Sequence, residues 1–129
     1  MNRIWSSRSL LALICVLLPA ASLAGGGVTT EDGVYTKAQA KSGKSLYESH
    51  CAMCHDNKYF RPVLKRWHGQ NLSVFYDVMS MSMPESNPGG LMDAEYLDIL
   101  AYIFSRSRYP DADEPLTLEK VAAITIEDP

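Results

Sequence analysis

The sequence is poor in cysteine and has no apolar run long enough to cross a membrane. Its 129 residues include three cysteines, and only one pair of them is closely spaced. The longest apolar run, residues 10–18, has nine residues before Pro19, whereas a membrane-spanning helix needs roughly 20. There is no second Cys-x-x-Cys motif, no internal repeat and no strand pattern. These absences leave one modest domain as the expected organisation.

The N-terminal residues are typical of an exported protein. Arg3 and Arg8 precede the apolar run, and Ser22 and Ala24 follow it as the small residues of a cleavage site. We therefore expect residues 1–24 to be a secretory signal peptide, with an uncleaved anchor as the alternative. Residues 25–35 are rich in glycine and polar groups, which predicts a flexible leader. Residues 36–129 then form the domain, with no stable membrane insertion.

Charge argues against a nucleic-acid partner. Without residues 1–24 the chain keeps ten basic and fifteen acidic side chains, a formal charge of −5. Phosphate binding needs clustered lysine and arginine. We therefore expect no nucleic acid among the partners.

The segment SHCAMCHDN, residues 49–57, contains the most informative motif, Cys-x-x-Cys-His. Three chemistries use this spacing: a redox dithiol, half of a zinc site, or covalent attachment of a c-type haem. Zinc needs further ligands, and a thioredoxin-like dithiol needs a strand before the motif, where this chain has a predicted helix. The haem interpretation explains every member: Cys51 and Cys54 form thioethers with the two vinyl groups, and His55 ligates the iron.

A second axial ligand is expected from the methionines of DVMSMSMPESNPGGL, residues 77–91. Thioether sulfur is soft and neutral and raises the reduction potential of a haem. Met83 is favoured because Pro84 stiffens the chain directly after it. Met81 is the rival ligand, and Met79 is expected in a helix or the core. If no methionine binds, the haem is five-coordinate.

Apolar residues recur every three or four positions and predict a small all-α domain. Thr36 and Asn71 are suitable N-caps for two of the helices. Acids at the start and arginines at the end of a third match the helix dipole. The expected helices cover residues 37–50, 72–79 and 93–107, and a short last helix begins at Thr117.

The combined pattern resembles a class I c-type cytochrome over residues 36–108. Gly43, Tyr47 and Cys51 keep the family's spacing of glycine, aromatic residue and first cysteine. Tyr102, in AYIF, is the expected contact where the last main helix crosses the first. The resemblance implies a small cytochrome c fold of three to four helices around one haem c, and within this class the chain is similar to cytochrome modules of periplasmic quinoprotein dehydrogenases.

Several positions depart from this pattern or have two interpretations. Met92 stands where a serine or threonine usually caps the last helix, so the cap must come from elsewhere. The 28-position separation of His55 and Met83 is short for the class. Pro62 is either a turn proline or the carbonyl that accepts the imidazole N–H. Trp67, with Arg66, either donates to a haem propionate or belongs to the core.

The resemblance implies a monomeric periplasmic electron carrier rather than an enzyme. Its expected partners are a quinoprotein or other dehydrogenase and a terminal oxidase or reductase of a respiratory chain. The alternative is a five-coordinate haem protein with a catalytic or ligand-sensing role. Net charge favours a partner with a basic rim, yet lysines concentrate in the first half of the domain, so an acidic partner stays open.

Overall fold

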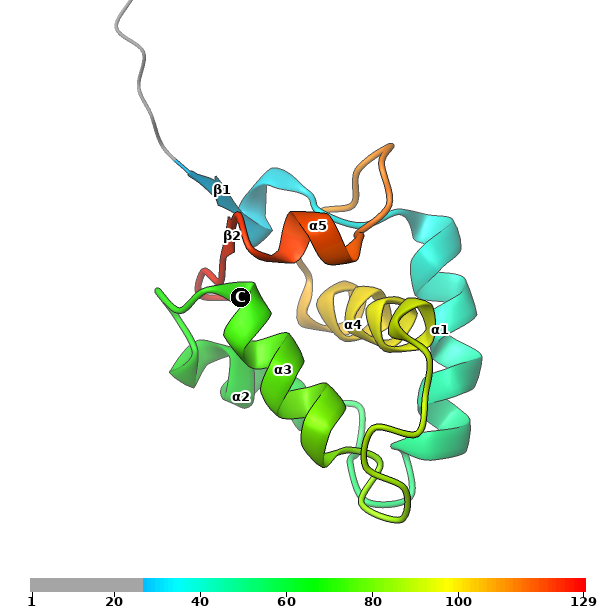
Figure 1. The fold of residues 1–129 in the computed structure, drawn as a ribbon. Coiled ribbons are helices and arrows are strands. Elements are labelled where there is room, and N and C mark those ends of the chain that lie inside the picture. The colour runs from blue at the N-terminus through cyan, green and yellow to red at the C-terminus, as the bar shows by residue number, and fades with distance from the viewer. Residues whose placement is uncertain (1–26) are drawn as a thin grey trace, which may run out of the picture.

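The structure is a computed structural model that describes residues 27–129, and its regular structure is mostly helical (Figure 1). The expected signal peptide lies outside the described residues. The predicted all-α class is confirmed, with more helices than the three to four expected. The helices are α1 Lys37–His50, α2 Phe60–Arg66, α3 Leu72–Ser82, α4 Asp93–Ser107 and α5 Leu118–Val121, and two short strands, β1 Val28–Thr29 and β2 Ile124–Thr125, pair in parallel.

Helices α1 and α4 cross at close range, where α4 meets α1 on the right-hand side of Figure 1. A Cβ atom added at Gly43 would lie 1.7 Å from the Asp98 carbonyl oxygen, so only glycine lets the two backbones approach this far. One turn further along each helix, the rings of Tyr47 and Tyr102 contact each other with centroids 5.1 Å apart. Both features confirm the crossing predicted from the sequence.

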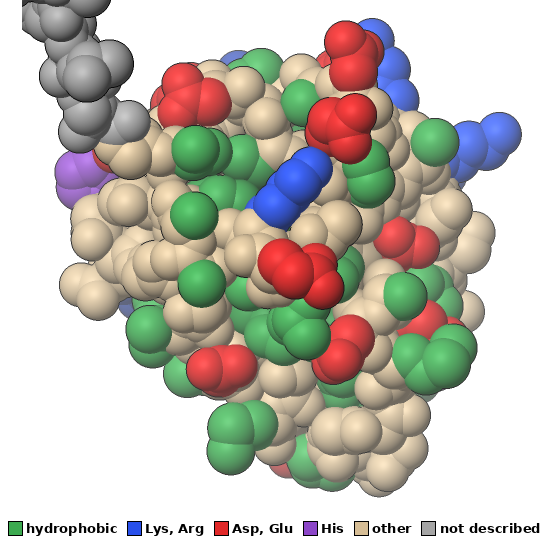
Figure 2. All heavy atoms as spheres, turned by 45° about the horizontal axis from the view of Figure 1, so that its top comes forward, with side chains coloured by type: hydrophobic (Ala, Val, Ile, Leu, Met, Phe, Trp, Pro, Cys, Tyr) green, Lys and Arg blue, Asp and Glu red, His purple; other side chains and the backbone are tan. Residues whose placement is uncertain are grey.

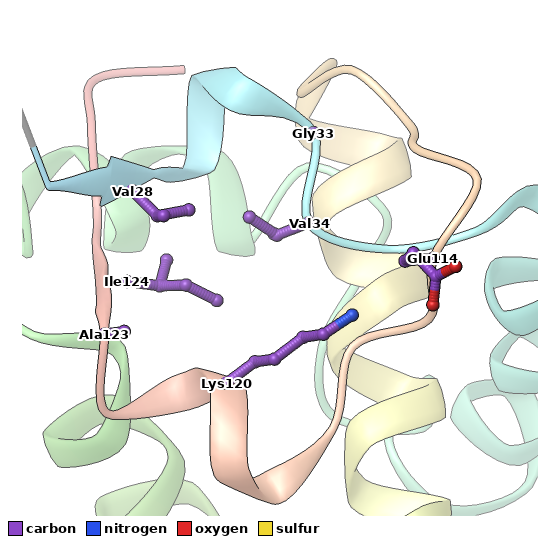
Figure 3. Close-up of a pocket in the computed structure, with 7 residues that line it drawn as sticks. All are labelled: Val28, Gly33, Val34, Glu114, Lys120, Ala123 and Ile124. Atoms are coloured by element: carbon purple, nitrogen blue, oxygen red, sulfur yellow. The ribbon is translucent and has the colours of Figure 1, made fainter.

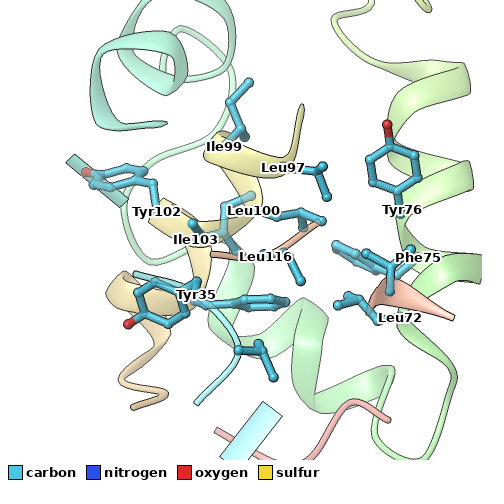
Figure 4. Packing of buried hydrophobic residues seen from close by; sticks show 14 of the residues in the cluster. Tyr35, Leu72, Phe75, Tyr76, Leu97, Ile99, Leu100, Tyr102, Ile103 and Leu116 are labelled. Atoms are coloured by element: carbon cyan, nitrogen blue, oxygen red, sulfur yellow. The ribbon is translucent and has the colours of Figure 1, made fainter. Parts of the chain in front are cut away.

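The core is built mainly on α4, which buries side chains on most of its circumference (Figure 4). Leu100 and Phe104 are fully buried, and burial of side chains of this size contributes about 1.5–3 kcal/mol each. On the opposite side α3 contributes Leu72 and Phe75. Helix α4 is thus the element against which the others pack.

Side chains cap three of the helices. Thr36 Oγ1 accepts a hydrogen bond from the N–H of Gln39 at 3.1 Å, and Asn71 Oδ1 accepts one from Ser73 at 2.8 Å, so both predicted caps are confirmed. At α4, the Glu95 carboxylate accepts from the Met92 N–H at 2.8 Å. This carboxylate satisfies a free donor of the first turn, where Met92 itself offers no oxygen.

Residues 27–35 differ from the expected flexible leader. Thr30 is fully buried, and Val34 and Tyr35 are nearly so. Strand β1 pairs with β2, and Thr30 Oγ1 accepts a hydrogen bond from the N–H of Glu127 at 2.9 Å. The local composition could not show this, because the partner segment lies more than 90 positions further along the chain.

Candidate haem-binding site

The four predicted ligand residues line one cleft, between the turn after α1 and the loop after α3. These two segments lie side by side at the lower end of the molecule in Figure 1. The cleft has a volume of about 120 Å³. It is lined by His50, Cys51, Cys54, His55, Phe60, Met79, Met83, Pro84, Glu85, Ile99 and Ile103.

One wall is the Cys-x-x-Cys-His segment, which leaves α1 through a chain of backbone hydrogen bonds. The N–H of Cys51 donates to Tyr47 at 2.8 Å, and the N–H groups of Cys54 and His55 donate back to Cys51 at 3.1 and 2.9 Å. Both cysteines are free thiols, and burial raises the pKa of Cys51. The turn therefore presents two thiols and one imidazole to the same cleft.

His55 is held by aromatic side chains. The ring of Tyr59 lies against the imidazole at a centroid distance of 4.1 Å, and Phe60 approaches it edge-on at 5.5 Å. The Tyr47 hydroxyl donates to the His55 carbonyl at 2.8 Å. Burial raises the pKa of Tyr47 to about 12, so this hydroxyl keeps its proton and stays a donor in neutral solution.

The expected second bond of the imidazole is not formed. His55 Nδ1 is buried and has no hydrogen-bond partner among the described residues. Pro62, proposed as the acceptor, lies in the first turn of α2, where its fixed φ suits a helix start. The suggested hydrogen bond from the His55 imidazole to the Pro62 carbonyl is therefore absent from this structure, and Pro62 is a helical residue rather than a turn proline.

The opposite wall comes from α3 and the residue after it. The three methionines separate clearly: Met79 is buried in α3 and lines the cleft, Met83 follows the helix and lines it too, whereas Met81 is 77% exposed and points elsewhere. The N–H of Met83 donates to Met79 at 2.9 Å, and the Met83 carbonyl accepts from the Tyr96 hydroxyl at 2.6 Å. Helix α3 runs three residues beyond the predicted end, which leaves Met83 at its C-cap.

The remaining polar candidates lie outside the cleft. Trp67 packs edge-on against Phe75 at 5.1 Å and so belongs to the core. Arg66 is exposed and does not line the cleft. His68 is half-exposed and its Nδ1 lies 3.2 Å from a Glu127 carboxylate oxygen. None of these three side chains contributes to the candidate site.

The donor set and the cleft suit a haem. Two thiols, an imidazole with an unpartnered buried nitrogen, and a thioether face a space bordered by Phe60, Ile99 and Ile103. Within residues 27–129, no group of three or more His, Cys, Asp or Glu side chains is arranged to bind a metal ion directly. The zinc interpretation of the Cys-x-x-Cys pair therefore finds no further ligands in the described chain.

A second pocket lies between the N-terminal and C-terminal segments (Figure 3). Apolar side chains such as Val28, Val34 and Ile124 line most of it, with Lys120 and Glu114 at its rim. It contains none of the predicted ligand residues.

Among the helices of residues 27–129, none has the length and apolar character that crossing a membrane requires.

Comparison with known proteins identifies the family. A family model described as cytochrome c oxidase, cbb3-type, subunit III matches residues 38–103, which is 66 of the 129 residues. This span contains all of α1 except its first residue, the Cys-x-x-Cys-His motif, Met83 and most of α4. Searches among curated proteins and among solved structures gave no match. The chain belongs to this family of cytochrome c domains, which makes it an electron-transfer haem protein with covalently bound haem c.

Proposed function

We propose that this protein is a periplasmic carrier of single electrons with one His/Met-ligated haem. The observation that carries the proposal is the placement of the ligand residues on two facing walls. Cys51, Cys54 and His55 line one wall of the cleft, and Met83 lines the other. A haem between these walls would have both axial positions filled, which suits electron transfer rather than substrate binding.

Each residue has a distinct role in this proposal. Cys51 and Cys54 would hold the haem covalently through thioether bonds, formed as each thiol adds across one vinyl double bond, and His55 and Met83 would bind its iron through nitrogen and sulfur. The bound haem supplies an iron that changes charge by one when an electron enters or leaves. The neutral, partly buried Met83 thioether would favour the lower-charged state of the iron, whereas Tyr47 and Tyr59 keep the His55 segment in place.

The proposed redox partners are an electron acceptor and an electron donor, each named by its class of protein. The matched family is described by an oxidase subunit, which supports a terminal oxidase among the acceptors. A dehydrogenase, such as a quinoprotein, is the expected donor, and a reductase is an alternative acceptor. Export by residues 1–24 would place the carrier in the periplasm, free and monomeric.

The test is expression with a cytochrome maturation system, followed by absorbance after denaturation. We expect haem to stay with the denatured chain at one per polypeptide, because thioether bonds survive unfolding. The reduced native protein should bind carbon monoxide slowly and incompletely at neutral pH. Rapid and complete binding would instead support the five-coordinate alternative, and a colourless protein with two titratable thiols would be a dithiol oxidoreductase.

A further inference from the structure

A shallow groove outside the haem cleft gathers basic side chains from α1 and α4. Its residues are Tyr35, Lys37, Ala40, Lys41, Lys44, Tyr102, Ser105, Arg106 and Asp111. The tyrosine rings are nearly buried, whereas the lysines and the arginine are exposed. The groove is therefore flanked by four cationic side chains and has aromatic and small residues between them.

The positive charge of the groove is only partly neutralised. Lys37 pairs with Asp111 at 3.6 Å, and Lys44 pairs with Glu48 of its own helix at 3.7 Å. Within residues 27–129, neither Lys41 nor Arg106 forms an ion pair. Figure 2 shows basic side chains at the upper right-hand edge, beside acidic ones, and one further basic side chain near the middle of that face among acidic side chains. Because residues 27–129 together carry a net charge of −5, this concentration of cations is a local reversal of sign.

Ring contacts connect the groove with the candidate ligand His55. Tyr102 contacts Tyr47 at 5.1 Å, Tyr47 contacts Phe60 at 6.0 Å, and Phe60 contacts His55 at 5.5 Å. Tyr102 and Phe60 also border a smaller cavity between the groove and the haem cleft. The groove thus lies on the His55 side of the site, joined to it by continuous packing, and the haem cleft with Met83 is a separate opening.

We propose that this groove is a docking site for an acidic segment of a redox-partner protein. The proposal rests on the electron-carrier function proposed above, and it names the chemistry of one partner. Carboxylates entering the groove would meet Lys41 and Arg106, whose charges are unpaired, and the arginine fork suits a carboxylate geometrically. Such a contact would be small and salt-sensitive, as transient electron-transfer interfaces are.

A protein segment fits better than a membrane surface. The cations surround a concave strip between two crossing helices, which an extended chain can enter and a flat bilayer cannot follow. The charge of −5 on residues 27–129 would also repel an anionic bilayer beyond the groove. The Lys37–Asp111 pair leaves the end of the groove near Asp111 less positive, so the acidic segment should bind closest to Lys41 and Arg106.

The experiment uses the haem-loaded protein and a hexa-aspartate peptide as the probe. We expect saturable amide chemical-shift changes at Lys41, Ser105 and Arg106 at low salt, which disappear at high salt. The Lys41→Glu/Arg106→Glu double variant should bind the peptide about tenfold more weakly. The matched control is Lys65→Glu/Arg66→Glu, which reverses the same two residue types on the exposed end of α2 and should weaken binding less than about threefold.

Several outcomes would overturn the proposal. Equal weakening by the two double variants would mean that net charge alone attracts the peptide, and shift changes centred outside the groove would place the site elsewhere. Binding to anionic phosphatidylglycerol vesicles without binding to the peptide would assign the groove to a membrane. If the groove variant does not fold, the chemical-shift changes of the unmodified protein still show whether the peptide binds in the groove. Peptide binding does not require Met83 ligation, so a five-coordinate haem would refute the carrier function without affecting this result.

Discussion

The two walls of the haem cleft are held in place by different kinds of interaction. The Cys51–His55 wall is local: it continues from α1, and its backbone hydrogen bonds join residues at most five positions apart. The Met83 wall depends on tertiary packing, because the Met83 carbonyl is fixed by the Tyr96 hydroxyl of α4. The loop that follows is tied back to α3 by a hydrogen bond from the Gly89 N–H to Ser80 at 3.0 Å.

Because of this difference, substitutions in the two walls should have different effects. A local motif forms as soon as its helix forms, whereas a wall held from another helix needs the whole domain to pack. We therefore expect damage to the first wall to remove the cofactor and damage to the second to change the properties of a cofactor that stays bound. Three substitutions test this distinction.

The largest effect is expected for His55→Ala. Loss of the imidazole removes both the axial nitrogen and the last member of the attachment motif, so stable holoprotein should not accumulate. The measurement is the yield of covalent haem per polypeptide. His50→Ala is the matched control, because His50 lines the same cleft but lies outside the motif. A normal haem yield in the His55 variant, or an equal loss in the control, would contradict the assignment.

The second effect is expected for Met83→Ala. Haem should stay attached, since the first wall is intact, but the reduction potential should fall and the iron should open to carbon monoxide or imidazole. Potentiometric titration and ligand-binding spectra measure these changes. Met81→Ala serves as the control, because that side chain is exposed and outside the cleft. The opposite pattern, a change in Met81→Ala alone, would make Met81 the ligand.

The features that the sequence predicts well are those with a local cause. The N-caps Thr36 and Asn71 and the limits of α1 and α4 follow from side chains within a few positions of each helix end. Gly43 was identifiable because its spacing from Tyr47 and Cys51 is characteristic of the family. The attachment motif was readable for the same reason, since its members are adjacent in the chain.

The features that sequence analysis missed have distant causes. Helix α2 is short and contains Pro62, so its sequence predicts a turn. The helix is stabilised by the burial of Leu64 in the core, which local sequence does not show. The order of residues 27–35 comes from pairing with β2 at the other end of the domain. The methionines are an intermediate case: sequence analysis favoured Met83 with Met81 as the rival, and the end of α3 leaves Met81 exposed and Met83 at the cleft.

The smallest and most discriminating effect is expected for Tyr96→Phe. The Tyr96 hydroxyl donates to the Met83 carbonyl at 2.6 Å, and its loss should cost about 1 kcal/mol of a typical hydrogen bond. The neighbouring Tyr76→Phe variant is the control, because its hydroxyl donates to Asp93 at 2.7 Å and does not touch Met83. Both variants should lower the free energy of unfolding by similar amounts in urea titrations.

Only Tyr96→Phe should loosen the Met83 wall. Imidazole should displace the methionine about fivefold more readily than in the unmodified protein, the ratio that 1 kcal/mol corresponds to, whereas Tyr76→Phe should leave displacement unchanged. Equal displacement in both variants would show that general stability controls the Met83 wall. Unchanged displacement in both would show that the segment with the buried Pro84 positions Met83 without help from α4. The expected result is easier displacement of the methionine in Tyr96→Phe alone. It would identify the hydrogen bond from Tyr96 of α4 as the contact that holds the Met83 wall against the core.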